Sequence, residues 1–259
     1  MEECYKIIEG RKTMGTNHYE RWLTVGIILL FIGAGILPAL AQDMEKPSLP
    51  GSRGGWLYVG GNGPGNYTKI QDAIDAALVG DTVFVLDDLS PYYEDITISK
   101  SISLVGEDRK TTVIDGQATP RFEINGENIV IKNITIQQGN INILGSDILI
   151  QNVIIPRASD TAIYLYHCNK IKILDSVIRE STYGVFLFQC QGIDIQGNNF
   201  IDNYYDGSFI VGKLPMFNRW SRNYWDDWDG TGPYVIRGKR YFIRWFNFDW
   251  HPAQEPYDI

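Results

Sequence analysis

The chain has 259 residues, of which 44% are hydrophobic and 21% are charged, and these proportions are typical of a folded protein and exclude a disordered one. The formal net charge is −8. Because residues 1–41 contain four acids and four bases, the remainder carries the whole excess, as 27 acids against 19 bases. This acidic body argues against a nucleic acid partner, since phosphate binding needs a basic face.

Residues 1–41 are typical of an export segment. The 20 residues from Trp22 to Ala41 have no charge, and Ala39-Leu40-Ala41 has the small-x-small form of a signal-peptidase site. The same length is enough to span a bilayer as an uncleaved anchor, but Gly33, Gly35 and Pro38 weaken its helix and favour cleavage. Both alternatives place the chain after about residue 42 in an extracellular or cell-surface location.

Residues 42–55 are rich in Pro, Gly and Ser and are predicted to be a linker. The fold is expected to begin at Trp56 with a short strand. A helix is then predicted over residues 69–79, started by a capping box between Thr68 and Gln71 and stopped at Gly80. One side of this helix is apolar and must be buried.

Four similar segments follow at 129–136, 148–155, 171–178 and 193–200, with offsets of 19, 23 and 22 residues. A second pair, 163–168 and 185–190, repeats at an offset of 22. Repeats of this length that contain short strands and no helix are typical of the coils of a parallel β-helix. We therefore predict an all-β solenoid over residues 56–203 with five or six coils and with the helix as its N-terminal cap.

Aligned residues in such a solenoid lie about 4.8 Å apart and form ladders. The inward ladders are expected to be isoleucines, the outward pairs to be aromatic, and the two exported cysteines to stack as small buried residues or, alternatively, to form a disulfide. A polar ladder is expected at a turn. The predicted members are Ile129/Ile148/Ile171/Ile193 and Ile131/Ile150/Ile173/Ile195 inward, Tyr164/Phe186 and Tyr166/Phe188 outward, Asn133/Asn152/Asp175 at the turn, and Cys168 over Cys190.

Residues 204–259 differ from the repeats, because five of the seven tryptophans lie between Trp220 and Trp250. An open solenoid exposes the end of its core, so this segment is predicted to be an aromatic C-terminal cap that closes the last coil and runs back along the solenoid.

Several segments give the chain a resemblance to the right-handed β-helix, pectin-lyase-like superfamily, and within it to NosD-type periplasmic proteins and archaeal surface proteins. They are residues 67–77, 80–85, 93–98 and 102–116, the exit Asn223-Tyr-Trp-Asp-Asp227, and the tail from 247 to 258. The resemblance implies a single-stranded right-handed parallel β-helix. It leaves the function open, since lyases, esterases, epimerases, copper-associated accessory proteins and inert surface modules share this fold.

If the chain is a carbohydrate-active enzyme, a polysaccharide lyase or an esterase, it needs carboxylates together with a base on an outer face. Asp175, Arg179 and Asp194 are the only such group in the middle coils, and no carboxylate pair is in register among them. A turn ladder and a solvated face explain these residues better. Nothing in the sequence therefore establishes a catalytic activity.

Asp226, Asp227 and Asp229 have the oxygen density of a Ca²⁺ loop, although the twelve-residue pattern that ends in glutamate is absent. A solvated acidic turn is the default explanation. A copper site of the kind suggested by the NosD resemblance would need His167 together with Cys168 and Cys190, but neighbours on a strand point to opposite faces.

The aromatic tail gives a further hypothesis. Trp225, Trp228 and Trp245, with Trp220 and Trp250, are candidates for flat faces on which the sugar rings of a polysaccharide or cell-surface glycan stack. A role in the core of the cap is the competing explanation. Three functions thus stay open: an exported or membrane-tethered surface module that binds glycans, a carbohydrate-active enzyme, and a copper-associated accessory protein.

Overall fold

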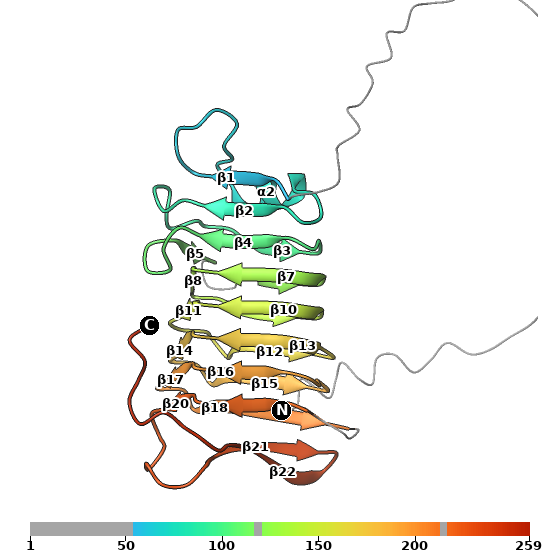
Figure 1. Cartoon of the computed structure of the whole chain (residues 1–259), viewed down its shortest axis with the longest axis vertical. Helices are drawn as coiled ribbons and strands as arrows, with labels where there is room; N and C mark the ends of the chain where they lie inside the picture. The colour runs from blue at the N-terminus through green and yellow to red at the C-terminus, as the bar shows by residue number, and fades with distance from the viewer. Residues whose placement is uncertain (1–53, 117–120, 213–216) are drawn as a thin grey trace, which may run out of the picture. The chain divides into compact units, whose positions relative to one another are not determined.

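Short strands wind around one axis to form a parallel β-solenoid of about seven turns (Figure 1). The computed structural model describes residues 54–116, 121–212 and 217–259. The predicted export segment and almost all of the predicted linker lie outside the described residues. The fold class predicted from the repeats is confirmed, with more coils than the five or six expected.

Most coils contribute one strand to each of three columns, which we call the first, second and third columns in chain order. The first column consists of β1 (Trp56–Val59), β2 (Thr82–Val85), β4 (Ser103–Gly106), β7 (Glu127–Lys132), β10 (Ser146–Gln151), β13 (Asn169–Leu174), β16 (Asp194–Gln196) and β19 (Arg219–Ser221). The second consists of β5 (Val113–Asp115), β8 (Thr135–Gln137), β11 (Ile154–Ile155), β14 (Val177–Arg179), β17 (Asn199–Ile201) and β20 (Tyr224–Trp225).

The third column consists of β3 (Ile96–Ile98), β6 (Arg121–Ile124), β9 (Asn140–Ile143), β12 (Thr161–Tyr166), β15 (Tyr183–Phe188) and β18 (Tyr205–Val211). All pairs within the three columns are parallel, as expected where each strand reaches its partner by one turn of the solenoid. A hairpin of β21 (Tyr234–Arg240) and β22 (Ile243–Asp249) joins the first and third columns at the C-terminal end.

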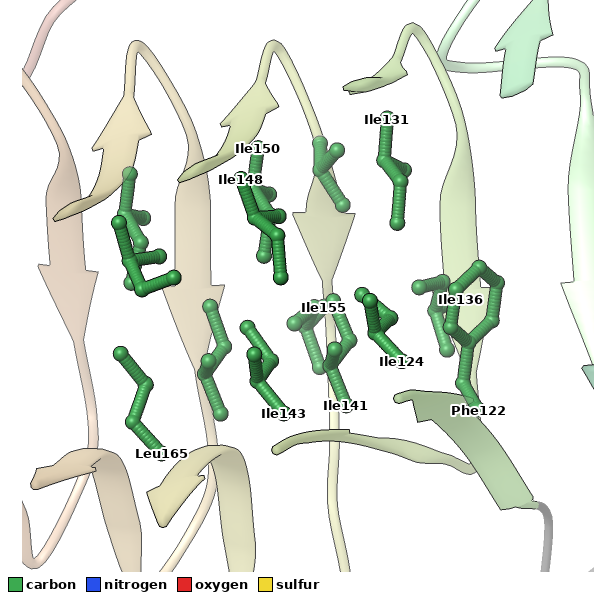
Figure 2. Packing of buried hydrophobic residues seen from close by; sticks show 14 of the residues in the cluster. Phe122, Ile124, Ile131, Ile136, Ile141, Ile143, Ile148, Ile150, Ile155 and Leu165 are labelled. Atoms are coloured by element: carbon green, nitrogen blue, oxygen red, sulfur yellow. The ribbon is translucent and has the colours of Figure 1, made fainter. Parts of the chain in front are cut away.

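The interior is a stack of isoleucine ladders. Ile150 pairs with Ile131 in the coil before it and with Ile173 in the coil after it, and Ile173 pairs with Ile195. All four are fully buried. Figure 2 shows the same interior filled from the facing column by Ile141 and its neighbours. Burial of each such side chain stabilises the folded state by about 1.5–3 kcal/mol. The repeated isoleucines therefore drive the folding of the solenoid.

The bend between the first and second columns has a left-handed residue in successive coils. Asn133 and Asn152 have φ of 56°, Asp175 has φ of 50°, Gly197 has φ of 68° and Arg222 has φ of 57°. Asn152 donates a side-chain hydrogen bond of 2.8 Å to Asn133. Asparagine and aspartate tolerate this conformation better than other residues with a Cβ, which explains the polar ladder predicted here.

The outward aromatic pairs and the cysteine pair also lie as predicted. Tyr164 stacks on Phe186 with ring centroids 5.7 Å apart, and Tyr166 stacks on Phe188 at 5.2 Å. Cys168 and Cys190 are both buried and both free.

The N-terminal cap is the helix α2 (Ile70–Ala76), which buries Ile70, Ala73 and Ile74 against the first coil. It is shorter than the predicted 69–79, and the predicted capping box is wrong. The side chain of Lys69 at the N-cap makes no capping hydrogen bond. Instead Glu94, from the following coil, accepts hydrogen bonds from the backbone N–H groups of Ile70 and Gln71 at 2.9 and 3.1 Å.

The C-terminal cap is the β21/β22 hairpin. Its inner face covers the last coil with Ile236, which is fully buried, and with the close approach of Gly238 to the ring of Phe209. The chain then runs back beside the second column, where Tyr257 exchanges two hydrogen bonds of 2.9 Å with Asn199. No helix of the described residues is both long enough and apolar enough to cross a bilayer.

Candidate functional site

The three predicted catalytic residues have separate partners. Asp175 lies in the bend after β13 and accepts a hydrogen bond of 2.9 Å from Gln151. Asp194 lies in β16 and forms an ion pair of 2.8 Å with Arg219 of the next coil. Arg179 ends β14, and its guanidinium lies 3.8 Å from the neighbouring Glu180. The structure therefore does not assemble these residues into a convergent acid–base group.

Trp225, predicted to bind sugar, is a core residue of the cap, and its prediction as an open sugar platform is wrong. It is 1% exposed, with its ring between Phe200 at 4.5 Å and Tyr234 at 4.2 Å, both nearly parallel to it. Its indole N–H donates to Asp249 at 3.2 Å. A ring covered on both faces cannot stack on a ligand.

The other predicted tryptophans differ in exposure. Trp228 packs against the core with its indole N–H bonded to the carbonyl of Thr231. Trp245 is 38% exposed, but the guanidinium of Arg240 lies over its ring at 5.6 Å and occupies one face. The five tryptophans thus do not form a common platform.

Two of the predicted metal ligands come together with a third carboxylate that the sequence analysis did not identify. Oxygen atoms of Asp206, Asp226 and Asp227 all lie within 4.8 Å of one another. Asp229 turns to Thr231, and hydrogen bonds from that residue lower the pKa of its carboxyl. We name the group Asp206, Asp226 and Asp227 the carboxylate cluster.

Asp206 differs from its two partners because it is only 3% exposed. The pKa of Asp206 is raised to about 7, chiefly by burial and also by the charges of Asp227 and Asp226, while a hydrogen bond from Asn203 at 3.0 Å opposes the rise. The hydroxyl of Tyr234 donates to the other carboxylate oxygen at 3.3 Å. Burial beside these carboxylates also raises the pKa of Tyr234.

Near neutral pH the carboxylate cluster can either bind a cation or hold a proton. Three carboxylates offer the hard oxygen ligands that Ca²⁺ prefers. With no cation, Asp206 retains its proton to near neutral pH, because burial and the adjacent carboxylates disfavour its ionised form. The sequence signal for Asp206 was an acid within a strand, β18, whose other six residues carry no charge.

An open hollow of about 510 Å³ lies at the bend between the second and third columns. Arg157, Glu180, Asp202 and Tyr204 are among the residues that line it. Arg157 and Glu180 form an ion pair of 2.6 Å, which lowers the pKa of Glu180. The backbone N–H of Asp202 donates to Asp226 at 2.5 Å, so the hollow borders the carboxylate cluster.

One tyrosine, Tyr204, lines this hollow, and it belongs to a group of contacting rings, Tyr183, Tyr204 and Tyr205, that we name the tyrosine edge. Tyr183 and Tyr205 stack at 5.1 Å, and Tyr204 meets Tyr205 edge to face at 4.6 Å. Tyr204 is 75% exposed and lines the hollow itself. A rigid aromatic surface therefore lies beside charged hydrogen-bonding groups.

The soft ligands that copper would need point in different directions. The ring of His167 lies outside, against Tyr166 at 4.4 Å and Phe188 at 5.7 Å. The thiols point inward, where Cys168 bonds to the carbonyl of Ile143 and Cys190 to that of Leu165. The hydrogen bond with Cys168 and burial raise the pKa of the Cys190 thiol, which disfavours the thiolate that binds metal.

Comparison with known proteins supports the fold. A family model described as a right handed beta helix region matches residues 94–215. Pectate lyase Pel9A is similar in structure, with 16% identity and a TM-score of 0.50, over 69% of this chain and 56% of that one. ORF18 of Geobacillus virus E2 is 17% identical with a TM-score of 0.45, over 56% of this chain and 39% of that one. No curated protein matches this chain in sequence.

Proposed function

We propose that this chain, a right-handed parallel β-helix of the pectin-lyase-like type, is a non-catalytic module, exported and displayed at the cell surface, that binds glycans along the tyrosine edge. The observation that carries the proposal is Tyr204, which is 75% exposed and lies beside the hollow that contains Arg157, Glu180 and Asp202. Export follows from the uncharged segment 22–41 of the sequence.

The arrangement suits a sugar chain for two physical reasons. An aromatic ring presents an apolar face to the C–H side of a pyranose, and the tyrosine edge is held in place by its own stacking. Charged groups in the hollow can hydrogen-bond the hydroxyl groups that such a ring leaves on its rim. The match covers only 56% of the pectate lyase named above, so the activity of that protein is not carried over.

The proposal is tested by a glycan array followed by calorimetry on residues 42–259, which contain the whole solenoid and both its caps. The substitution Tyr204→Ala should weaken binding about tenfold, since stacking on one aromatic contributes about 1 kcal/mol or more. Tyr93→Ala is the matched control, because Tyr93 is 59% exposed near the N-terminal end. Absence of any glycan ligand, or equal loss in the control, would contradict the proposal.

A polysaccharide lyase or esterase is the second candidate. It is favoured by the carboxylate cluster, where Asp206 titrates at about 7, near the pH at which a general acid or base works best. The two candidates separate in one assay with polygalacturonate and Ca²⁺. A lyase forms an unsaturated product that absorbs ultraviolet light, whereas a binding module leaves the polymer intact.

A further inference from the structure

The β21/β22 hairpin extends past the part of the cap that covers the core. Strand β21 pairs with β18 from Arg237 to Arg240, so this pairing runs up to the turn of the hairpin. Tyr241 and Phe242 then form the turn, and the chain returns at Ile243. Tyr241 is 59%, Phe242 91% and Ile243 68% exposed, so the tip presents three large apolar side chains to solvent.

The hairpin also has a charge opposite to that of the protein. From Tyr234 to Phe248 the sequence contains four basic residues and no acidic one, within a chain of net charge −8. On the face turned away from the core, Lys239 pairs directly with Arg244, and Arg237 pairs with Phe246. Basic and aromatic side chains thus alternate around an apolar tip.

We propose that this hairpin docks the protein on the surface of an anionic lipid bilayer, with Phe242 and Ile243 at the boundary between headgroups and acyl chains. Aromatic and aliphatic side chains favour that boundary, where Tyr and Trp are enriched. Lys239, Arg240 and Arg244 lie one or two residues from the tip, which places their charges at headgroup depth. This interaction is separate from the tyrosine edge and does not depend on it.

Charge favours a bilayer over a second copy of the chain as the occupant. A symmetric contact through this face would bring Arg237, Lys239 and Arg244 against the same residues of the other copy, and like charges repel. Anionic lipids attract each of them, by about 1 kcal/mol per basic residue near the surface. A sugar ligand would explain neither the two consecutive aliphatic and aromatic residues of the tip nor the surplus of bases.

The test is sedimentation of residues 42–259 with vesicles of phosphatidylcholine alone and of an equal mixture of phosphatidylcholine and phosphatidylglycerol. The protein should bind only the mixed vesicles and should dissociate as salt increases. The double substitution Lys239→Gln, Arg244→Gln should weaken binding about thirtyfold, from about 1 kcal/mol for each charge. Phe242→Ser with Ile243→Ser should weaken it about tenfold or more.

The matched control is Leu78→Ser with Val79→Ser. These two consecutive residues are 59% and 69% exposed, and they follow α2 at the opposite end of the solenoid. The control should bind vesicles as the unchanged protein does. Thermal unfolding of every variant verifies that each one is folded.

Three results would overturn the proposal. The first is no binding of the unchanged protein to mixed vesicles. The second is equal binding by the Phe242→Ser, Ile243→Ser variant. The third is a dimer in solution that this double substitution abolishes while vesicle binding is absent, since that result would identify a second copy as the occupant.

Discussion

The last coils and the C-terminal cap of this solenoid use buried polar groups in opposite ways. Near the last coils buried polar groups are linked from coil to coil, because Asn198 accepts a hydrogen bond from the backbone N–H of Ser176 and Asn223 accepts one from that of Asn198. In the cap the ladder stops, and Asp249 receives the last hydrogen bonds from Asn223 and from the indole of Trp225. The comparison teaches that a repeated residue supports the stack, whereas an unrepeated buried residue marks a place with a separate task.

The largest effect is expected at the end of the stack. Trp225→Ala should lower the free energy of unfolding by about 3–5 kcal/mol, because it removes a ring held between Phe200 and Tyr234 and takes away one of the donors to the buried Asp249. Chemical denaturation measures the loss. Trp250→Ala is the control, since Trp250 is 66% exposed and its removal should change stability by less than about 0.5 kcal/mol. Equal losses in the two variants would mean that the cap is not closed by Trp225.

The second effect depends on pH. The folded-state pKa of Asp206, about 7, lies above the ordinary aspartate value of 3.8, so the folded protein binds more protons than the unfolded chain between these values. The free energy of unfolding should therefore fall as pH rises from about 4 to above 7. We expect a fall of roughly 3 kcal/mol, less than the full shift implies, because the exposed Asp226 and Asp227 can move away.

Asp206→Asn removes this titration, so thermal unfolding of that variant should change little over the same range. Asp229→Asn is the control and should retain the fall, since Asp229 bonds to Thr231 instead. Calcium added at pH 8 should raise the unfolding midpoint of the unchanged protein if the carboxylate cluster binds the ion. A stability that rises with pH in the unchanged protein would contradict a buried, protonated Asp206.

The smallest effect concerns the other end of the stack. Glu94→Ala should lower the free energy of unfolding by about 1 kcal/mol, because it removes the acceptor for two backbone N–H groups at the start of α2. Thr68→Ala should leave stability nearly unchanged. If instead Thr68→Ala gives the larger loss in denaturation, the helix is capped from its own sequence, as the capping-box motif predicted.

The ladders were predictable from sequence because they depend on period alone. Once residues 129, 148 and 171 are aligned, the pairing of every isoleucine follows, and so do the outer stack of Tyr166 on Phe188 and the positions of both cysteines. The repeat period thus predicts which residues are in contact, since two aligned residues are separated in sequence by one turn of the solenoid.

The candidate site was much less predictable, because its residues occur once. Asp206 lies in β18, whereas Asp226 and Asp227 follow β20 in a segment of different composition. No repeat period in the sequence therefore predicts that the three carboxylates are close together. Glu94 caps a helix more than twenty residues earlier, in place of the local motif. The aromatic tail also contained two groups that composition could not separate: Trp225 is buried in the cap, whereas Phe242 lies at an exposed tip.

The bend between the first and second columns has a practical consequence for how this chain tolerates change. In five successive coils it contains two residues, from Asn133-Ile134 to Arg222-Asn223, the first of them left-handed. All variation in coil length therefore falls in the other two corners, which contain from two to seven residues between strands from β8 to β19. Foreign peptides inserted at those corners should leave the vertical spacing of the strands intact, whereas a single added residue in the fixed corner would disturb its left-handed bend and the strand pairing of that coil.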